Sequence, residues 1–530
     1  MCGFTFLSDS SMEIAQLESQ ESIISHRGPD DTVVKKDHLG NILFFHRLSI
    51  MDLSTNGRQP FMLNEKLLMC NGEIYNYKQL RSFLKEENYT FNGGSDCEVL
   101  LPLFESVGME TMVKMLDGEF VFVLVDEKTN EVFAARDPFG IRPLFYGETY
   151  ENGKIAFSSE AKGLIDYCQN IKPFPPGHYY ANGAFHLYYD VAKTQHLIEA
   201  PVDELAQGIR LRLEEAVLKR MDTDAPMGYL LSGGLDSSLV CAIAQKHSDK
   251  PIQTFAIGME MDPIDLKYAK QAAEYIGTNH TEVTMTKKDV LGALREVIFS
   301  LETWDITTIR ASIGMYLVAK YIHEHTDIKV LMTGEVSDEL FGYKYTDFAP
   351  NAAAFQKESM KRVRQLYMYD VLRADRSLAA HSLEARVPFA DLQFCAYVMS
   401  INPKRKMNQY GKGKYLLRYA FKDSGLLTDE LLFREKAAFS DAVGHSMVDY
   451  LQEYANEVYC DDQLAMASVK YPQNTPFTKE SLLYRDIFEE FYAGYAHWIT
   501  DFWMPNKEWV GNDVNDPSAR VLSNYGDSGK

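Results

Sequence analysis

The chain has 530 residues, of which 46% are hydrophobic and 24% are charged, proportions typical of globular proteins. This length exceeds what one hydrophobic core usually serves, so we expect at least two domains. The formal net charge of −21 repels a phosphate backbone, so we expect no nucleic-acid partner.

The N-terminus has no basic segment followed by an apolar run, and no apolar stretch approaches the ~18 residues that cross a bilayer. We therefore expect no membrane partner and a cytoplasmic location. The seven cysteines are widely spaced and form no CxxC pair. This pattern argues against a disulfide framework or a zinc site and favours a reducing compartment.

The first ~190 residues are rich in β-favouring segments and in Gly- and Pro-containing turns. The apolar runs 120–125 and 132–135 flank a polar segment, which predicts an antiparallel hairpin. A further strand is predicted at 67–70, ended by Asn71-Gly72. These features indicate a β-rich N-terminal domain.

From about Pro201 the pattern changes to alternating helices and strands. Residues 205–220 have helical spacing, 229–231 form a short apolar strand, and a helix is predicted at 237–246 after a Gly-rich turn. Strands at 254–257 and 330–332 follow, which implies a parallel sheet covered by helices. We predict an N-terminal domain at 1–190, a linker at 191–204, an α/β domain with helical additions at 205–505 and a loose tail at 506–530.

A cysteine occupies position two, in Met1-Cys2-Gly3-Phe4. A small second residue permits removal of the initiator methionine, which would leave Cys2 with both a thiol and a free α-amine. The reference pKa of an α-amine is about 7.7–8.0, so it accepts a proton near neutral pH and activates the thiol. In isolation, a cysteine at this position is usually incidental.

Four further segments follow Cys2 in order: 26–30 (HRGPD), 46–50 (HRLSI), 71–76 (NGEIYN) and 94–98 (GSDCE). The order and the residue sequences of these segments resemble those of the class II glutamine amidotransferases, whose nucleophile is an N-terminal cysteine. The resemblance covers about 190 residues. It implies an α+β domain of the Ntn type, an αββα sandwich, that hydrolyses glutamine.

Glutamine is a zwitterion with a side-chain amide, and the motif residues match these groups. Arg47 suits the α-carboxylate, Asp96 and Glu73 suit the α-ammonium, and Asn71 with the Gly72 N–H suits an oxyanion hole. The resemblance extends the glutamine-binding set along the chain from Arg47 to Leu48, Ser49, Ile50 and Met51. The alternative interpretation is a hairpin turn at Asn71-Gly72 and a surface cation at Arg47.

A second site is predicted at the segment 232–238 (SGGLDSS), between a strand and a helix. Its small residues let backbone N–H groups face an anion at a helix N-terminus, where Ser237 or Ser238 is a possible N-cap. It lacks the Gly-Lys-Ser/Thr ending of a Walker A loop and resembles the pyrophosphate loop of the ATP pyrophosphatases. That resemblance implies an ATP site at Ser232, Gly233, Gly234, Asp236, Ser237 and Ser238.

A second loop, 333–339, follows another predicted strand. Asp236 and Asp338 are oxygen ligands in these two loops and suit Mg²⁺ bridging phosphates, although each is also a possible helix cap. We therefore predict Mg²⁺ as the cofactor, with ATP as substrate.

The segments 307–310, 373–376, 383–389 and 434–441 narrow the resemblance to the asparagine synthetase family, from residue 2 to about 505. The resemblance implies that Leu231, Ile257, Thr333 and Gly334 contact adenosine, that Thr307, Thr308 and Arg310 bind aspartate, that Lys436 binds phosphates, and that Glu335 is a general base. Individually, Lys436, Arg310 and Glu335 also suit a solvated side chain, a surface salt bridge and a helix-terminal charge.

Two positions depart from the family pattern. Many members have glycine where this chain has Val336, and Gly-Gly-Tyr where it has 342–344 (GYK). A β-branched side chain disfavours positive φ, which puts the geometry of this loop in question.

The predicted reaction converts aspartate and ATP to β-aspartyl-AMP, which ammonia from glutamine turns into asparagine and AMP. The resemblance also implies a homodimer. The alternatives are an enzyme that amidates another carboxylate and a degenerate nucleotide-binding sensor, which would have lost Cys2, Asp236 or Lys436. A lactam-forming relative needs no Cys2, and sugar and phosphoribosyl amidotransferases share only the first half of the chain.

Overall fold

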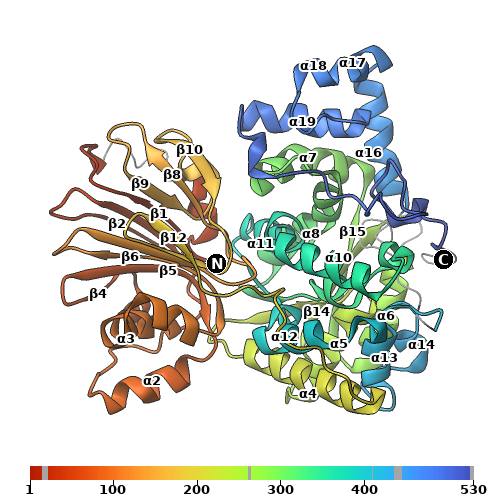
Figure 1. Cartoon of the computed structure of the whole chain (residues 1–530), viewed down its shortest axis with the longest axis horizontal. Coiled ribbons are helices and arrows are strands. Elements are labelled where there is room, and N and C mark those ends of the chain that lie inside the picture. Colours follow the sequence, from red (N-terminus) through yellow and green to blue (C-terminus); the bar gives the residue numbers. More distant parts are fainter. Residues whose placement is uncertain (15–21, 261–263, 409, 435–444, 526–530) are drawn as a thin grey trace.

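The computed structural model describes residues 1–14, 22–260, 264–408, 410–434 and 445–525. Two domains lie side by side: a β-rich N-terminal domain on the left of Figure 1 and a helix-rich C-terminal domain on the right. The N-terminus lies where the two domains meet. No helix within the described ranges combines the length and apolar character needed to cross a bilayer.

The N-terminal domain stacks two antiparallel six-stranded sheets, ordered β10-β8-β9-β1-β3-β2 and β12-β11-β7-β6-β5-β4. Helices α2 (Tyr77–Glu86) and α3 (Leu100–Met115) cover the second sheet from below in Figure 1. This arrangement confirms the predicted α+β class. The strands are β1 Gly3–Leu7, β2 Asp31–Lys36, β3 Ile42–Arg47, β4 Phe61–Leu63, β5 Lys66–Ile74, β6 Gly118–Asp126, β7 Glu131–Arg136, β8 Phe145–Thr149, β9 Ile155–Ser158, β10 Cys168–Pro173, β11 His178–Ala181 and β12 Ala184–Leu187.

Strand β6 is buried on both faces, which explains its unbroken apolar run. Phe120 and Phe122 pack toward the helices, whereas Val121 and Val123 pack between the two sheets. Its antiparallel pairing with β7 runs from Val121 opposite Arg136 to Asp126 opposite Glu131 and confirms the predicted hairpin.

The sequence predicts that strand β5 is ended by Asn71. In the structure the strand continues to Ile74 beside β6. Gly72 makes this continuation possible. Its φ is +149°, and a Cβ atom there would lie 2.1 Å from the Glu119 carbonyl oxygen. Only glycine fits such a close backbone approach, so the alternative of a hairpin turn at Asn71-Gly72 is wrong.

The C-terminal domain contains a five-stranded sheet ordered β15-β14-β13-β16-β17, in which all neighbouring strands are parallel. Adjacent residues of β16 point into different clusters, Leu331 into one and Met332 into another, so both faces are covered. The predicted α/β class is confirmed. The strands are β13 Met227–Leu230, β14 Gln253–Met259, β15 Asn279–Met285, β16 Val330–Met332 and β17 Glu384–Arg386.

The helices of this domain begin earlier than predicted at two places, because α4 starts at Val202 and α5 at Leu235. A helical layer of α7, α16 and α19 lies at the top of the domain in Figure 1. The helices are α4 Val202–Arg220, α5 Leu235–Lys246, α6 Ile264–Ile276, α7 Lys287–Leu301, α8 Ile306–His325, α9 Ser337–Phe341, α10 Ala352–Gln365, α11 Asp370–Ala379, α12 Leu392–Ser400, α13 Tyr415–Phe421, α14 Asp429–Leu432, α16 His445–Val458, α17 Asp461–Ala465, α18 Ala467–Lys470 and α19 Lys479–Phe491.

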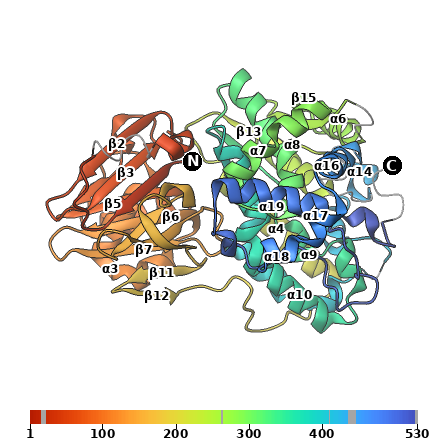
Figure 2. The same cartoon turned by 90° about the horizontal axis from the view of Figure 1, so that it is seen from above.

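The connection between the domains runs from the end of β12 at Leu187 to the start of α4, along the lower edge of Figure 2. Buried ion pairs hold the domains together. Arg27 pairs with Asp375 at 3.0 Å, and Glu119 pairs with Arg220 at 2.8 Å. Removing one partner of a buried pair costs about 3–5 kcal/mol, so the two domains have a fixed mutual orientation.

Residues 506–525 pack against the C-terminal domain, whereas the sequence predicts a loose tail. Trp509 is 7% exposed and contacts the cluster of Ala349 and Phe355. Asn512 donates from its side chain to the Tyr345 carbonyl oxygen at 2.9 Å. The prediction failed because it followed the polar average of the tail, whereas a few spaced apolar side chains anchor it.

Candidate active sites

Cys2 lies just before β1, beside the core between the two sheets. Its thiol donates to the Leu48 carbonyl oxygen, with Sγ 3.7 Å from that oxygen. Met1 precedes it and is 1% exposed. Burial lowers the pKa of the Met1 amine to about 6 and raises the pKa of the Cys2 thiol to about 11. The predicted base, an α-amine on Cys2 itself, therefore forms only when Met1 is removed.

Asn71 is fully buried on β5, and β5 packs on β1. Its Nδ2 and Oδ1 atoms have no hydrogen-bond partner among the described residues. A buried amide without partners costs about 1–3 kcal/mol, so such a group usually awaits a ligand or a water. Together with the backbone of Gly72, it suits the predicted oxyanion hole.

Two carboxyl groups, Glu73 and Asp96, lie buried near this position. Burial raises the pKa of Asp96 to about 6, although the Ile74 N–H donates to it at 2.6 Å. Burial also raises the pKa of Glu73 well above its usual range, despite Arg386 at 3.1 Å. A cationic ligand would stabilise both ionised forms, so the pair suits an α-ammonium group.

Arg47, at the end of β3, organises the loop that follows it. Its guanidinium donates to the carbonyl oxygens of Ser54, at 2.9 Å, and Asp52. Leu48, Ile50 and Met51 of this loop pack against Ala225 and Val330 of the other domain, and the Ser49 N–H donates to Asp30 at 2.7 Å. The glutamine-binding role of Arg47 and of these loop residues stays a prediction.

The second site lies at the carboxyl ends of the central strands β13 and β16. The chain continues from β13 toward β14 and β15 on one side, and β16 neighbours β17 on the other. Parallel sheets bind ligands in the crevice at such a switch point. A cavity of about 220 Å³ opens there, lined by the loops after both strands.

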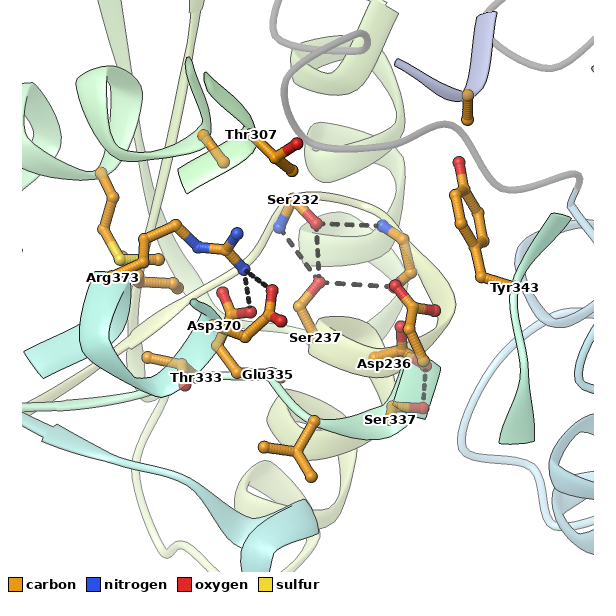
Figure 3. A pocket seen from close by; sticks show the side chains of 18 of the residues that line it. Ser232, Asp236, Ser237, Thr307, Thr333, Glu335, Ser337, Tyr343, Asp370 and Arg373 are labelled. Carbon is orange, nitrogen blue, oxygen red and sulfur yellow. Dashed lines mark hydrogen bonds and ion pairs between the residues drawn. The ribbon is translucent and has the colours of Figure 1, made fainter. Parts of the chain in front are cut away.

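Hydrogen bonds between two serines of the loop after β13 stabilise its conformation (Figure 3). The Ser232 and Ser237 hydroxyls are 3.0 Å apart, and the Ser232 N–H donates to Ser237 at 3.2 Å. Gly234 is the N-cap of α5, so neither Ser237 nor Ser238 has the predicted N-cap role. A Cβ at Gly334 would lie 2.8 Å from the Ser237 backbone nitrogen, so glycine lets the two loops meet.

Asp236 and Asp338 lie in the first turns of α5 and α9 and are not the N-caps of these helices. Both contact the ammonium of Lys414, at 2.8 and 2.5 Å, and the Ser337 hydroxyl donates to Asp236 at 2.8 Å. The predicted metal ligands thus converge on one cation position. Sequence analysis missed Lys414, whose only signal is a Gly-Lys-Gly-Lys run at 411–414.

The donor set around this position fits Mg²⁺. The described residues contain no group of three or more His, Cys, Asp or Glu side chains that would form a complete metal cage. Mg²⁺ typically takes one or two carboxylates and completes its shell with phosphate oxygens and water. The Lys414 ammonium places one positive charge between the two carboxylates.

Glu335 follows the loop glycine and lies beside Arg373 of α11 in the lining of the cavity (Figure 3). Arg373 makes ion pairs with Glu335 and, at 3.1 Å, with Asp370. This pairing fixes the Glu335 carboxylate inside the cavity. Its role as a general base stays a prediction.

The predicted aspartate residues all line the cavity from the start of α8. Thr308 donates from both its N–H and its hydroxyl to Asp305 at 2.8 Å, which caps the helix. The Thr307 hydroxyl is buried and has no partner among the described residues. Arg310 forms a buried ion pair with Glu480 at 2.5 Å, so the alternative of a surface salt bridge is wrong.

Leu231, Ile257 and Thr333 line the cavity, and so does Arg434. The Arg434 guanidinium lies 3.7 Å from the centre of the Tyr268 ring and donates to the Gly233 carbonyl oxygen at 3.1 Å. Of the predicted ATP residues, the described cavity lining contains Leu231, Ser232, Gly234, Asp236, Ser237, Ile257, Thr333 and Gly334 but not Gly233 or Ser238. Lys436 lies outside the described residues.

The two halves of the chain match two different protein families. Residues 1–221 match the family described as glutamine amidotransferase domain, and residues 208–352 and 345–511 match the family described as asparagine synthase. The chain is 42% identical over 573 residues to the asparagine synthetase (glutamine-hydrolyzing) of Cricetulus griseus, covering 100% of both chains.

This chain belongs to the asparagine synthetase family. The protein of that name from Homo sapiens is also 42% identical, over 568 residues and 99% of each chain. A solved glutamine phosphoribosylpyrophosphate amidotransferase from B. subtilis is similar at 17% identity, with a TM-score of 0.31, and covers 53% of this chain and 65% of its own. The family membership rests on the full-length relatives and on the family matches.

Proposed function

We propose that the chain synthesises asparagine from aspartate, glutamine and ATP at two sites, one in each domain. One observation carries the proposal. In a chain of this family, Asp236 and Asp338 converge on a single cation position beside the loop at 232–238. Such a site suits ATP cleaved between its α- and β-phosphates, and the N-terminal site suits the release of ammonia.

The N-terminal reaction begins when the Cys2 thiolate attacks the amide carbon of glutamine. Asn71 and the Gly72 N–H stabilise the negative oxygen that forms, and removal of one such donor typically costs about 10²–10³ in rate. Ammonia leaves, a glutamyl thioester remains, and water releases glutamate. Arg47 binds the α-carboxylate, and Asp96 with Glu73 binds the α-ammonium.

The C-terminal reaction activates aspartate. A β-carboxylate oxygen attacks the α-phosphorus of ATP, pyrophosphate leaves, and β-aspartyl-AMP forms. Asp236 and Asp338 would hold the Mg²⁺ that accompanies ATP, which neutralises phosphate charge. Thr307 and Arg310 bind aspartate, and Lys436 binds the phosphates.

Ammonia then displaces AMP from the activated carboxylate. Glu335 takes a proton from the attacking nitrogen, and Arg373 holds the Glu335 carboxylate in place. Ammonia must stay unprotonated between the sites, which favours transfer through the protein interior. Glu73 of the first site touches Arg386, on β17 of the second domain, so the two sites are joined by buried contacts.

The decisive experiment is product analysis with labelled glutamine, aspartate and ATP. We expect asparagine, glutamate, AMP and pyrophosphate in equal amounts. Exchange of labelled pyrophosphate into ATP should depend on aspartate and not on other amino acids or carboxylic acids. Formation of ADP, or exchange driven better by another acid, would contradict the proposal.

The homodimer, which the family resemblance implies, and the cytoplasmic location, which the sequence predicts, are further parts of the proposal. Sedimentation of the purified chain tests the first. Imaging of the tagged chain in cells tests the second.

A further inference from the structure

The C-terminal segment 506–525, here called the strap, crosses the synthetase cavity. Pro517, Ser518, Ala519 and Leu522 of the strap line the same cavity as Thr307. The strap is anchored on both sides of this crossing, by Trp509 on one side and by Leu522, which packs with Tyr345, on the other. It therefore forms part of the wall of the proposed aspartate site.

At the centre of the strap, the Asp516 carboxylate forms a two-pronged ion pair with Arg310. The Arg310 Nη1 and Nη2 atoms donate to Asp516 Oδ1 and Oδ2 at 2.9 and 3.1 Å. This parallel geometry is the one by which arginine recognises any free carboxylate. Arg310 is also the residue that, in the proposed function, binds the substrate aspartate.

Counting donors shows that Arg310 has no room for a second carboxylate of this kind. A guanidinium has five N–H groups. Glu480 takes the Nε donor at 2.7 Å and one Nη2 donor at 2.5 Å, and Asp516 takes one donor from each Nη atom. Only one Nη1 N–H lies outside these four bonds, whereas a two-pronged substrate contact needs two donors. One protein carboxylate must therefore leave before the substrate binds.

Asp516 is the partner that is easier to displace. The Glu480 side chain is 3% exposed, lies in the first turn of α19 and accepts a further bond from the Tyr484 hydroxyl at 2.8 Å. The Asp516 side chain is 22% exposed and lies outside any helix or strand. Its other contacts are the Gln452 side-chain amide at 2.9 Å and the Ser518 N–H at 2.8 Å.

Asp516 is ionised at neutral pH, so its carboxylate competes with a substrate carboxylate for Arg310. Burial acts to raise its pKa, but hydrogen bonds from Arg310 and the positive charge of Arg310 hold the pKa below its usual range. Arg310, Glu480 and Asp516 together carry a net negative charge, which repels a dicarboxylate substrate. Releasing Asp516 removes this repulsion and frees two donors.

We propose that Asp516 is an internal mimic of the substrate, whose side chain occupies the carboxylate site of aspartate on Arg310 and sets the affinity for aspartate. This inference rests on the proposed function. The strap supplies the mimic at a high effective concentration because both its sides are anchored. Aspartate binds only to the fraction of molecules in which Asp516 has left Arg310, so its apparent affinity is reduced by that fraction.

The test is the substitution Asp516→Asn, which removes the charge and keeps the size of the side chain. The matched control is Asp513→Asn, because Asp513 is an exposed residue of the same strap. Activity is measured with ammonium in place of glutamine. We expect D516N to lower the KM for aspartate by about three- to tenfold, with kcat and the KM for ATP unchanged. D513N should match the wild type.

A KM for aspartate that is unchanged or raised in D516N would overturn the inference, because a merely structural role predicts a loss of affinity. Hydrogen exchange of the wild-type chain gives a second test that needs no variant. Saturating aspartate should speed exchange in residues 506–525, and slower exchange would overturn the inference. If the wild type shows no aspartate-dependent pyrophosphate exchange at all, it is the proposed function that fails.

Discussion

The two sites are prepared for their substrates in opposite ways. In the N-terminal site, the buried Asn71 amide has no partner among the described residues, and burial raises the pKa of Asp96 to about 6. In the C-terminal site, several charged side chains pair with one another. Lys414 lies between Asp236 and Asp338.

This difference has a physical consequence. A substrate that enters the first site satisfies groups whose desolvation cost is already present in the folded chain. Under the proposed role of Asp516, a substrate that enters the second site replaces the internal ion pair of Arg310 with Asp516. We therefore expect changes in the first site to act mainly on rate, and changes in the second to act on affinity and stability.

The largest effect is expected for the substitution Cys2→Ala, which removes the proposed nucleophile of the first site. Glutamine-driven synthesis should fall to background, on the order of 10⁶-fold, whereas ammonium-driven synthesis should persist because the second site is intact. Cys460→Ala, at an exposed cysteine, is the matched control. Loss of both activities in C2A would show that the two sites are not separable.

Asn71→Ala sharpens the same comparison without removing the nucleophile. We expect kcat for glutamine hydrolysis to fall by about 10²–10³ because one oxyanion donor is lost, with little change in the KM for glutamine. Thermal stability should not fall, because the amide has no partner among the described residues. A rise in KM with unchanged kcat would place Asn71 in substrate binding instead.

Lys414→Met tests the internal pairing of the second site. It leaves two carboxylates facing each other, and we expect a loss of about 3 kcal/mol in the free energy of unfolding, since Asp338 is partly exposed. Millimolar Mg²⁺ should restore part of this loss, because a new cation reaches the same carboxylates. Thermal unfolding with and without Mg²⁺ measures both effects. Lys422→Met, at an exposed lysine, should show neither.

The sequence predicted those parts of the fold that depend on local pattern. The apolar run at β6, buried on both faces, and the β13–turn–α5 unit were found because periodicity and turn residues mark them. Strand β17 was not predicted. It reads Glu-Ala-Arg, and its charges are buried only because Glu384 and Arg386 pair with each other and with the N-terminal domain. No local pattern encodes such a partner.

The same limit applies to the sites. The glycine-rich loop at 232–238 is contiguous in sequence, so its position between a strand and a helix was predicted from the sequence. Lys414 and Asp516 were missed because their roles arise from contacts with Asp236 and Arg310, 178 and 206 residues away along the chain. A residue that pairs with a motif residue from a distant part of the chain carries no motif of its own, so the sequence alone does not mark it.

The pH dependence of glutamine hydrolysis examines the buried acids of the first site. Protonated Asp96 is neutral and does not attract an ammonium group. Because burial raises its pKa to about 6, the KM for glutamine should rise about tenfold per pH unit below that value. Burial also raises the pKa of Glu73, whose carboxyl repels that of Asp96, so both groups contribute to this rise in KM. Asp96→Asn should raise the KM at neutral pH and flatten this rise. If the KM of D96N rises with the same slope at low pH, the group that titrates is another residue.

The smallest expected effect concerns Val336, where the chain departs from the family pattern. The structure places it at φ +80°, in the left-handed region that a β-branched residue disfavours, at a cost of about 1–2 kcal/mol. Its side chain is 2% exposed and packs in the buried cluster that also contains Leu340 and Phe394, so removing it also loses burial energy. Val336→Gly therefore gains from relief of strain and loses from packing, and we expect a net change of only about 1 kcal/mol.

A comparison of two variants separates these opposing contributions. Val336→Ala loses most of the packing but keeps the left-handed strain, since alanine also has a Cβ atom. We expect V336A to be less stable than V336G by about 1 kcal/mol, the reverse of the usual order of these residues in a helix. Chemical denaturation of both variants measures the difference. A more stable V336A would mean that the loop after β16 relaxes out of the left-handed conformation, and the close approach of Gly334 to Ser237 would then have to change with it.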